Sequence, residues 1–485
     1  MDGVYTADQI RAAEGAMMET VAEGVLMRRA AYGLAAHVID RLGGAYGRRV
    51  TLLVGAGDNG GDALWAGVEL RRRGAAVTAV LLTPDRAHPA GLSAFRRARG
   101  RVLVGTAPAA VDAVARADVV IDGIVGISGT PGLRDPAPAL VAAAESSGVP
   151  IVACDLPSGV GADTGETDGP CVRAAVTVTF GARKPVHALA APLCGPVRLV
   201  DFGLGPFLPE PHARLLRDAD VADRWPVPGP SDDKYTQGVV GIAAGSATYP
   251  GAAVLAAGAA ALSTSGMVRF AGSAADEVRR HWPEIVATGD ITDAGRTQAW
   301  AVGPGIGTGS HGRAALEAVL DRDVPLCIDA DGITLLAQHA DLRERIHGRP
   351  IVLTPHAGEF ARIAGDVGAD RVEATRRAAA DLGVTVLLKG NATVVADPDG
   401  RTLIDPAADA WAATAGSGDV LTGMTGALLA AGLEPWWAAG CATFVHARAA
   451  TAAAREHGLP PVPAPASRLQ AAVPEALRAV RAALS

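Results

Sequence analysis

The stretch VTLLVGAGDNGGDALWAGVELRRRG, residues 50–74, has the pattern of a strand, a tight turn and a helix. Its first five residues favour a strand, glycines fill the turn, and the last part ends in arginines and a glycine, which are typical helix-stop signals. An apolar strand of this kind is typical of a parallel sheet covered by helices on both sides. The stretch therefore predicts a doubly wound α/β fold.

The same alternation continues through the first half of the chain. Short apolar runs, suited to strands, alternate with alanine-rich helical segments. The expected strands lie at residues 51–54, 75–82, 117–122, 150–155, 175–180 and 196–201. We predict a Rossmann-like, three-layer α/β/α domain over residues 1–215.

The second half also alternates strands and helices, but its sequence shows no obvious repeat of the first half. Residues 206–238 are rich in proline and charge and lack periodicity, so we place a linker at 216–234 and a second α/β domain at 235–485. The segment 251–267 is rich in small residues, and we predict a buried helix there, because Ala, Gly and Ser gain little on transfer into lipid. Further expected strands lie at residues 239–245, 299–305, 325–332, 350–356, 384–390 and 392–400, before long C-terminal helices.

Composition narrows the function classes. The chain has 485 residues and a net charge of −7 with no basic stripe, which disfavours nucleic acid as the main ligand. Its five cysteines lie far apart without a CxxC pair, which fits a reducing compartment and argues against a disulfide framework or structural zinc. The N-terminus does not look like a signal peptide. We expect a cytoplasmic protein without a membrane partner.

The glycine-rich turn GAGDNGGD, residues 55–62, has the features of a ligand site. Backbone N–H groups in such a turn, and the positive end of the following helix, can hold an anion. Asp58, Asn59 and Asp62 add hard oxygen ligands that suit a cation beside that anion. The alternative is that aspartate and asparagine only cap the helix. GxGxxG alone is a weak signal, because the acidic residue expected about 20 residues later is not evident.

Two other expected strand ends carry polar residues. Asp122 ends the strand VVID and is followed by several glycines, while Asp155 and Ser158 follow the strand in PIVACDLPSG. Ligands of open α/β sheets bind beyond the carboxyl ends of the strands, so three such ends favour one shared site over three separate turn-forming aspartates. Asp155 is our candidate for proton transfer. Lys184 is a weaker candidate, and the alternative is a solvated loop lysine.

The stretch ATAGSGDVLTGMTGALLAAG, residues 413–432, is the strongest single signal in the chain. Gly416, Ser417 and Gly418 form a turn whose N–H groups converge at a helix start and can stabilise charge on a transferring phosphoryl group. Asp419, in the first helical turn, can accept a proton from a substrate hydroxyl. The alternative is an ordinary helix start.

The first half resembles the N-terminal domain of the NAD(P)H-hydrate epimerase family over roughly residues 5–205. The shared stretches are GAGDNGGDALWAG, VIDGIVGISGTPG, ACDLPSGVGADTG and VTFGARKP. The resemblance implies a potassium ion held by Asn59, Asp122 and Ser158. The substrate contacts that it implies are Asp58, Asn59, Gly60, Gly61, Asp62, Gly126, Ile127, Ser128, Gly129, Thr130, Pro131, Gly132 and Asp155.

Two positions depart from that family's pattern. Asp58 stands where the family usually has asparagine, and Ala63 stands where glycine is usual. A carboxylate near a phosphate is unfavourable unless a cation lies between them. We therefore expect substrate affinity in this chain to depend on the bound cation.

The second half, roughly residues 225–485, resembles the ribokinase-like superfamily, and more narrowly its ADP-dependent NAD(P)H-hydrate dehydratases. The matching stretches include DDKYTQGVVGIAAGS, VGPGIG, CIDADG, LTPHAGEFARI, LLKGNATVV and GSGDVLTG, in this order. The resemblance implies hydrate contacts at Ala252, Gly305, Gly307, His356 and Asp419. It implies adenine-nucleotide contacts at Lys389, Gly390, Asn391, Ala392, Thr393 and Gly418.

Two side chains in this half keep an alternative interpretation. His356 also fits a structural hydrogen-bonding role, and Lys389 also fits a strand end that faces water. Asp329 and Asp331 in CIDADG are expected to orient the nucleotide or a metal.

Together the resemblances imply a bifunctional repair enzyme for hydrated NADH and NADPH. The first half would interconvert the R and S hydrates. The second would dehydrate the S hydrate with ADP and Mg²⁺, giving AMP and phosphate, with Asp419 taking the hydroxyl proton. The alternatives are a vitamin-type small-molecule kinase with an accessory nucleotide-binding domain, and a first half that is only a binding module. We expect hydrates and ADP as ligands and a homo-oligomeric protein.

Overall fold

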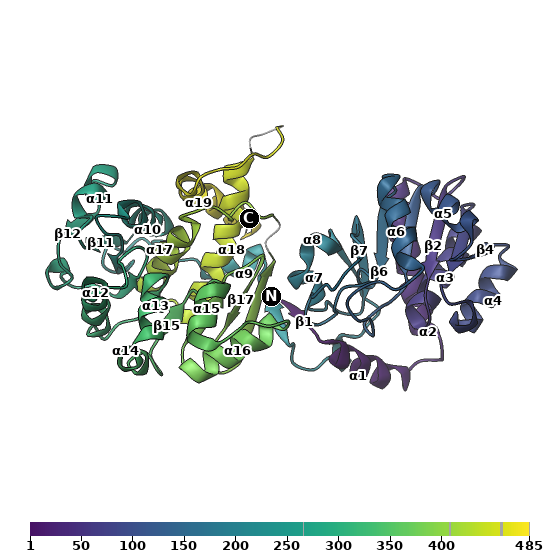
Figure 1. Cartoon of the computed structure of the whole chain (residues 1–485), viewed down its shortest axis with the longest axis horizontal. Coiled ribbons are helices and arrows are strands. Elements are labelled where there is room, and N and C mark those ends of the chain that lie inside the picture. Colours follow the sequence, from purple (N-terminus) through teal and green to yellow (C-terminus); the bar gives the residue numbers. More distant parts are fainter. Residues whose placement is uncertain (265, 407–408, 456–458, 485) are drawn as a thin grey trace. The chain divides into compact units, whose positions relative to one another are not determined.

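The structure is a computed structural model that describes residues 1–264, 266–406, 409–455 and 459–484 (Figure 1). The chain divides into two compact units. Gly3–Ala213 form the N-terminal unit, and Arg214–Ser485 with Met1–Asp2 form the C-terminal unit. None of the helices in these described ranges combines the length and apolar character needed to span a bilayer.

The N-terminal unit is built on a parallel sheet of seven strands in the order β4-β3-β2-β5-β6-β7-β8. The order reverses between β2 and β5, which is the position where open α/β sheets bind ligands. The strands are β2 (Arg49–Val54), β3 (Ala76–Leu81), β4 (Arg101–Val104), β5 (Val119–Gly123), β6 (Ile151–Cys154), β7 (Val176–Phe180) and β8 (Val197–Val200).

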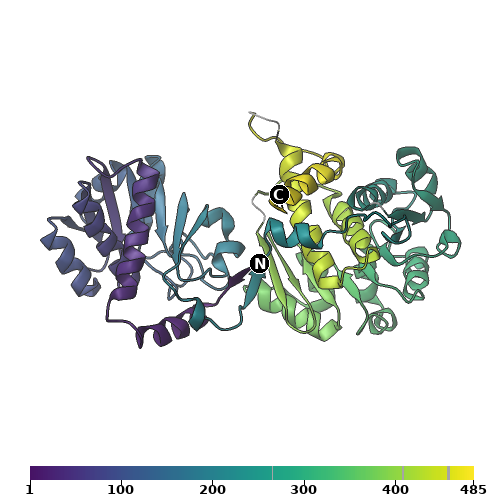
Figure 2. The ribbon, with the colours of Figure 1, turned by 180° about the vertical axis from the view of Figure 1, so that it is seen from behind.

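Helices cover both faces of this sheet, as the apolar strands predict (Figures 1 and 2). Leu52 of β2 packs in one core cluster with residues of α2 and α3, and its neighbour Leu53 packs in another with residues of α5 and α6. The three-layer α/β/α prediction is therefore confirmed. The helices are α1 (Ala7–Met18), α2 (Val25–Leu42), α3 (Asp58–Arg72), α4 (Pro89–Arg97), α5 (Pro108–Ala115), α6 (Ala137–Ser146), α7 (Val186–Leu189) and α8 (Ala191–Cys194).

The C-terminal unit has a mixed sheet in the order β1-β9-β18-β17-β16-β15-β14-β13-β10-β11-β12. Strands β10 to β16 pair in parallel, and β16, β17 and β18 pair antiparallel. The order reverses between β13 and β10, again a ligand-binding position. The strands are β1 (Asp2–Val4), β9 (Ala213–Leu215), β10 (Val239–Ala243), β11 (Met267–Ala271), β12 (Val286–Thr288), β13 (Ala299–Val302), β14 (Leu326–Ile328), β15 (Ile351–Leu353), β16 (Thr385–Leu388), β17 (Ala392–Ala396) and β18 (Thr402–Pro406).

Helices also cover both faces of the second sheet. One core cluster joins the sheet to α10, α17, α18 and α19, and the other joins it to α12, α13 and α16. The remaining helices are short. The helices of this unit are α9 (Asp218–Arg224), α10 (Pro250–Ser263), α11 (Ala275–His281), α12 (Ser310–Leu320), α13 (Asp331–Gln338), α14 (Ala340–Glu344), α15 (Ala357–Ala364), α16 (Arg371–Leu382), α17 (Ser417–Ala430), α18 (Pro435–Ala454) and α19 (Ala466–Arg481).

The buried helix expected at 251–267 is α10, and it ends at Ser263. Residue 265 lies outside the described residues, and β11 begins at Met267. Small side chains let α10 pack closely on α17: a Cβ at Gly423 would lie 2.0 Å from the carbonyl oxygen of Ala256. This contact fixes α17, whose N-terminus carries Asp419.

Part of the segment expected as a linker, 216–234, is folded. It contains α9, and Val221, Ala222 and Trp225 are buried in the core of the C-terminal unit. The Trp225 indole also donates to the Ser263 carbonyl at 2.9 Å. Residues 218–225 therefore belong to the C-terminal unit and are not a linker. Tryptophans are concentrated in this unit: Trp65 lies in the N-terminal unit and the other six lie in the C-terminal unit.

Two candidate active sites

The glycine turn at residues 55–62 lies between β2 and α3, beside the point where the N-terminal strand order reverses. The N-cap of α3 is Gly57, with φ 84°, and no side chain caps the helix. The alternative that Asp58 and Asn59 serve as caps is therefore wrong. A Cβ at Gly55 would lie 1.9 Å from the Ile124 carbonyl oxygen, so the turn packs directly against the loop after β5.

Asn59 of this turn lies close to the loop after β5, to which Asp122 and Ser158 are hydrogen-bonded, and all three side chains are at most 9% exposed. The Asp122 carboxylate accepts from the Ser158 hydroxyl at 2.7 Å and from the Ser158 amide at 2.8 Å. Burial raises the Asp122 pKa to about 6, and the Ser158 bonds oppose that rise. The Asn59 side chain lies beside Gly126, where a Cβ would be 3.3 Å away, and its buried Nδ2 atom has no hydrogen-bond partner among the described residues.

Asp155 directly follows β6 and forms an ion pair with Lys184, with 2.5 Å between Lys184 Nζ and Asp155 Oδ1. Lys184 is 1% exposed, so the alternative of a solvated loop lysine is wrong. Its ammonium also donates to the Thr179 hydroxyl and to the Phe180 carbonyl. The Thr179 hydroxyl in turn donates to Asp155 Oδ1. Among the described residues, Oδ2 of Asp155 has no hydrogen-bond donor.

The pKa of Asp155 is displaced in the opposite direction from those of the carboxyl groups near it. Burial alone would raise the Asp155 pKa, but the charge and hydrogen bond of Lys184 bring it below its usual value. Burial raises the pKa of Asp62 well above the ordinary aspartate value, and the Asp155 charge adds to this rise. The Glu14 pKa is also raised by burial. Two carboxyl groups with pKa values displaced in opposite directions are typical of acid–base sites.

The remaining predicted residues of this half, 126–132, form the loop after β5. The Gly129 amide donates to the Gly126 carbonyl, and the Gly132 amide donates to the Gly159 carbonyl, both at 2.9 Å. The loop is therefore tied to the segment that contains Ser158. The residues of the loop are half-buried or exposed, so a ligand can reach them. The loop, the turn at 55–62 and Asp155 all follow the carboxyl ends of neighbouring strands, β5, β2 and β6.

In the C-terminal unit, α17 starts at the GSGD turn. Gly416 is the N-cap, with φ 87°, and half-buried Asp419 lies in the first turn. Burial raises the Asp419 pKa to about 7, and the charges of Asp329 and Asp331 act in the same direction. A carboxylate with a pKa near the working pH suits a general base.

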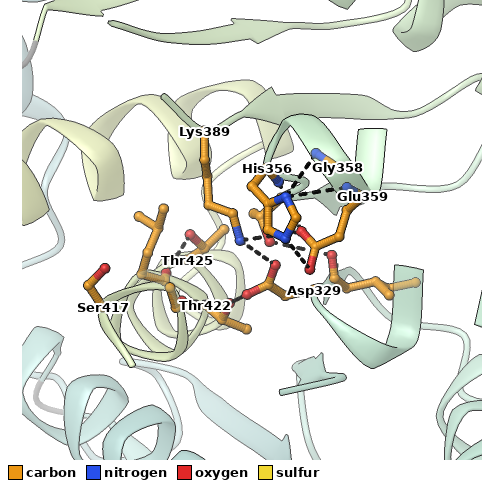
Figure 3. Close-up of polar contacts among 12 residues, drawn as sticks. Asp329, His356, Gly358, Glu359, Lys389, Ser417, Thr422 and Thr425 are labelled. Atoms are coloured by element: carbon orange, nitrogen blue, oxygen red, sulfur yellow. Dashed lines mark hydrogen bonds and ion pairs between the residues drawn. The ribbon is translucent and has the colours of Figure 1, made fainter. Parts of the chain in front are cut away.

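Asp329 and Lys389 form the centre of a polar cluster beside this turn (Figure 3). Lys389 Nζ lies 2.7 Å from Asp329 Oδ1 and 3.8 Å from Glu359 Oε2. The Thr422 hydroxyl of α17 donates to Asp329 Oδ2 at 2.7 Å. Burial alone would lower the Lys389 pKa, but Asp329 and Glu359 raise it. The Lys389 side chain is 21% exposed and held by two carboxylates, so it does not simply face water.

His356 is the N-cap of α15. Its Nδ1 accepts from the amides of Gly358 and Glu359, and its amide donates to the Glu359 carboxylate (Figure 3). His356 therefore has the structural hydrogen-bonding role that was the alternative interpretation. Its side chain is 56% exposed, so it is also accessible to a ligand.

The other predicted residues of this half lie around the same sheet end. A Cβ at Gly305 would lie 3.2 Å from Ala252 Cβ, and the Gly307 amide donates to Asp331 at 2.9 Å. A Cβ at Gly418 would lie 3.4 Å from Lys389 Nζ. The turn and start of β17 after Lys389 carry the remaining four: Gly390, Asn391, Ala392 and Thr393.

Comparison with known proteins assigns the chain to a family. A family model described as NAD(P)H-hydrate dehydratase matches residues 240–473, and one described as YjeF-related protein N-terminus matches residues 23–186. The bifunctional NAD(P)H-hydrate repair enzyme Nnr of Mycobacterium leprae (strain TN) is 56% identical over 481 residues, which cover 98% of this chain and 99% of that protein. The chain belongs to the bifunctional NAD(P)H-hydrate repair enzyme family.

Solved structures resemble the C-terminal part of this family member. A ribokinase-like superfamily protein from Enterococcus faecalis V583 has a TM-score of 0.50 at 21% identity, covering 56% of this chain and 96% of its own. The predicted ribokinase-like fold is confirmed. An ADP/ATP-dependent NAD(P)H-hydrate dehydratase from Bacillus subtilis, co-crystallised with ATP and Mg²⁺, has a TM-score of 0.47 at 27% identity, covering 55% of this chain and 99% of its own.

Several polar residues at the two sites of this repair-enzyme family member were not predicted from the sequence. Near Asp155 they are Glu14, Thr179 and His187, and near Lys389 they are Glu359 and Thr422. Only the spacing of Glu359, three residues after His356, gives a signal, because it is that of a capping box.

Proposed function

We propose that this chain repairs hydrated NADH and NADPH in two steps. The N-terminal unit interconverts the R and S hydrates, and the C-terminal unit dehydrates the S hydrate with ADP, giving AMP and phosphate. One observation carries the proposal: each unit of this family member has a carboxyl group with a displaced pKa and a lysine near it, Asp155 with Lys184 and Asp419 with Asp329 and Lys389.

In the proposed epimerase site, Asp155 is the group that moves a proton. Its Oδ1 is held by Lys184 and Thr179, which leaves Oδ2 for the substrate. A carboxylate with a lowered pKa is ionised at neutral pH, so it can accept the hydroxyl proton as the ring opens. In that step the hydroxyl carbon becomes a carbonyl and the C–N bond breaks with its electron pair going to the ring nitrogen. The carboxylate returns the proton when the ring closes on the other face. Residues 58–62 and 126–132 are proposed to hold the nucleotide.

The proposed potassium ion would be held by Asn59, Asp122 and Ser158. These residues offer amide, carboxylate and hydroxyl oxygens, which suit a hard cation. The buried Asn59 amide supports the fit, because one of its terminal atoms lacks a partner and amide oxygen and nitrogen can exchange places in assignment. When bound, the ion would neutralise charge between Asp58 and the substrate phosphates.

This proposal predicts that epimerisation depends on potassium. Replacing potassium by choline should raise KM for the R hydrate, and Asp58→Asn should reduce that dependence because the extra carboxylate is gone. Ser158→Ala should weaken potassium activation by at least about tenfold, the effect of losing even an outer partner of a metal site. Initial rates over a potassium titration measure the potassium dependence of the wild type and of both variants.

The matched control for Ser158→Ala is Ser93→Ala, on the exposed side of α4. It should leave the potassium titration unchanged. Equal rates in potassium and choline for the wild-type chain would contradict the cation site without affecting the assignment of Asp155.

In the proposed dehydratase site, Asp419 takes the proton of the substrate hydroxyl as that oxygen attacks the terminal phosphoryl group. The N–H groups at Gly416 and Gly418 stabilise the charge on the phosphoryl oxygens, and Lys389 contacts the nucleotide phosphates. The Ser417 N–H, predicted to share this role, donates instead to the Thr414 carbonyl at 3.2 Å. Phosphate then leaves in place of hydroxide, and the adjacent ring carbon loses a proton to solvent, which restores the double bond of the dihydronicotinamide ring.

Magnesium is proposed to enter with the nucleotide. Among the described residues, no group of three or more His, Cys, Asp or Glu side chains could hold a metal alone. This fits Mg²⁺, which usually keeps waters and binds through one or two carboxylates plus substrate phosphates. Asp329 and Asp331 are the proposed carboxylates. When bound, the ion would neutralise phosphate charge.

A mixture of R and S hydrates tests the whole proposal. The full chain with ADP and Mg²⁺ should consume both epimers, restore the nicotinamide absorbance and release phosphate and AMP. A stable phosphorylated product would support the vitamin-type kinase instead. Consumption of the S hydrate alone, under conditions where the epimers do not interconvert spontaneously, would favour a binding-module role for the first half. Parallel reactions with ATP determine the nucleotide preference.

We also propose a cytoplasmic, homo-oligomeric protein. All five cysteines are free, which supports a reducing compartment. Light scattering of the purified chain measures the oligomeric state.

A further inference from the structure

His187 lies three residues after Lys184 and bridges Asp155 and Lys184, the two residues of the proposed epimerase centre. It is 4% exposed, in α7. Its Nδ1 accepts from the Lys184 amide at 3.0 Å, and its Nε2 lies 2.9 Å from the Asp155 carbonyl oxygen. One imidazole therefore joins the backbones of two residues that lie far apart in the sequence.

These two contacts fix the tautomer of His187. Because Nδ1 accepts a hydrogen bond, the ring proton is on Nε2, which donates to the Asp155 carbonyl. Burial and the Lys184 charge together lower the His187 pKa to about 4. Asp155 and Arg183 are the other charged groups that act on the ring. The imidazole is therefore neutral, and both of its nitrogens are engaged.

The backbone of Asp155 needs such support. Its φ is 71°, in the left-handed region that residues other than glycine rarely adopt. The Asp155 amide is held by the Val178 carbonyl at 2.8 Å, and its carbonyl is held by His187. Residues kept in such a conformation persist where the surrounding structure over-determines them, often at active sites.

We propose that His187 is a positioning residue of the epimerase centre, holding Asp155 and Lys184 in one fixed arrangement. The inference rests on the proposed function, because it assigns the proton transfer to Asp155. With both nitrogens bonded to backbone, His187 acts through Asp155 and not on the substrate. Losing the bridge frees the Asp155 peptide to rotate and moves its carboxylate away from both the ammonium and the substrate.

Three substitutions in the full chain separate the two hydrogen bonds. His187→Leu removes both. His187→Gln can keep the donor to Asp155, because its amide nitrogen lies as many bonds from Cα as Nε2 does. His187→Asn can keep only the acceptor for the Lys184 amide, because its Oδ1 corresponds to Nδ1.

The expected loss in epimerisation kcat for His187→Leu is about 10–100-fold, since small displacements of a reacting group have effects of this size. KM should stay within about twofold of the wild type, because residues 58–62 and 126–132, which are proposed to hold the nucleotide, are not altered. The acidic limb of the pH–rate profile should move to higher pH, because Asp155 loses part of its pairing with Lys184. His187→Gln should recover most of kcat and His187→Asn much less. Dehydration by the same polypeptide should not change.

Two outcomes overturn the inference: kcat and pH profile unchanged in His187→Leu, or KM raised with kcat unchanged. If the leucine variant does not fold, the order of the glutamine and asparagine variants decides, and equal loss in both overturns it. If the wild type does not epimerise hydrates, the proposed function fails. ¹⁵N NMR of labelled histidine then tests the bridge separately: an Nε2-protonated, neutral His187 at pH 6 supports it, and any other state overturns it.

Discussion

Asp419→Asn is expected to lower the rate of S-hydrate dehydration by about 10²–10⁴-fold, the usual contribution of a general base. The amide cannot take the hydroxyl proton, although it has nearly the shape of the carboxylate. Epimerisation by the same chain should continue at the wild-type rate, because it depends on a different sheet. Nicotinamide absorbance with saturating ADP measures the first rate, and chiral chromatography measures the second.

The pH profile provides a second readout for Asp419. Its pKa of about 7 means that the base is protonated and inactive below that pH, so wild-type kcat/KM for dehydration should rise through about pH 7 and then level off. Asp321→Asn, at an exposed surface ion pair, is the matched control and should keep both rate and profile. A dehydration rate within threefold of wild type for Asp419→Asn contradicts the assignment.

The second large effect is expected for Asp155→Asn, which should lower epimerisation by about 10²–10⁴-fold and leave dehydration of pure S hydrate unchanged. Asparagine keeps the shape but cannot accept and return the proton. Chiral chromatography of R hydrate incubated without nucleotide measures the loss. Asp112→Asn, an exposed position on α5, is the matched control.

Asp155→Asn also removes the counter-ion of a buried lysine, so folding must be measured beside activity. Breaking a buried pair on one side costs about 3–5 kcal/mol of unfolding free energy. Asp155→Asn with Lys184→Met removes both charges and should recover part of that stability while staying inactive. A double variant that regains epimerisation would show that the single variant fails through folding and that Asp155 does not transfer the proton.

The sequence predicts most of the fold, because alternating apolar strands and alanine-rich helices leave a clear periodic record. The missed strands are short. β4 has only four residues, RVLV, between two glycines, and β11 and β18 each contain a charged residue. Their pairing partners, which the local sequence does not reveal, stabilise them as strands.

Some residues of the two candidate sites can also be predicted from the sequence, and others cannot. Strand ends and glycine turns in the sequence indicate where Asp122, Asp155 and Asp419 lie, because the topology of an α/β sheet brings such ends together. Lys184 is underestimated, since its burial depends on acceptors from Asp155 and Phe180 that only the folded chain brings to it. His187 has no signature at all, because its role is defined by two backbone groups.

The uneven placement of tryptophan determines what optical methods can observe. Six of the seven indoles lie in the C-terminal unit, and Trp300 and Trp225 are deeply buried there. Intrinsic fluorescence during denaturation will therefore report mainly on the melting of that half, whereas circular dichroism will average over both. Trp65 is the only tryptophan of the N-terminal unit, and it lies on α3, the helix that begins at the glycine turn 55–62. A chain that keeps this indole and carries phenylalanine at the other six positions would emit from that half alone.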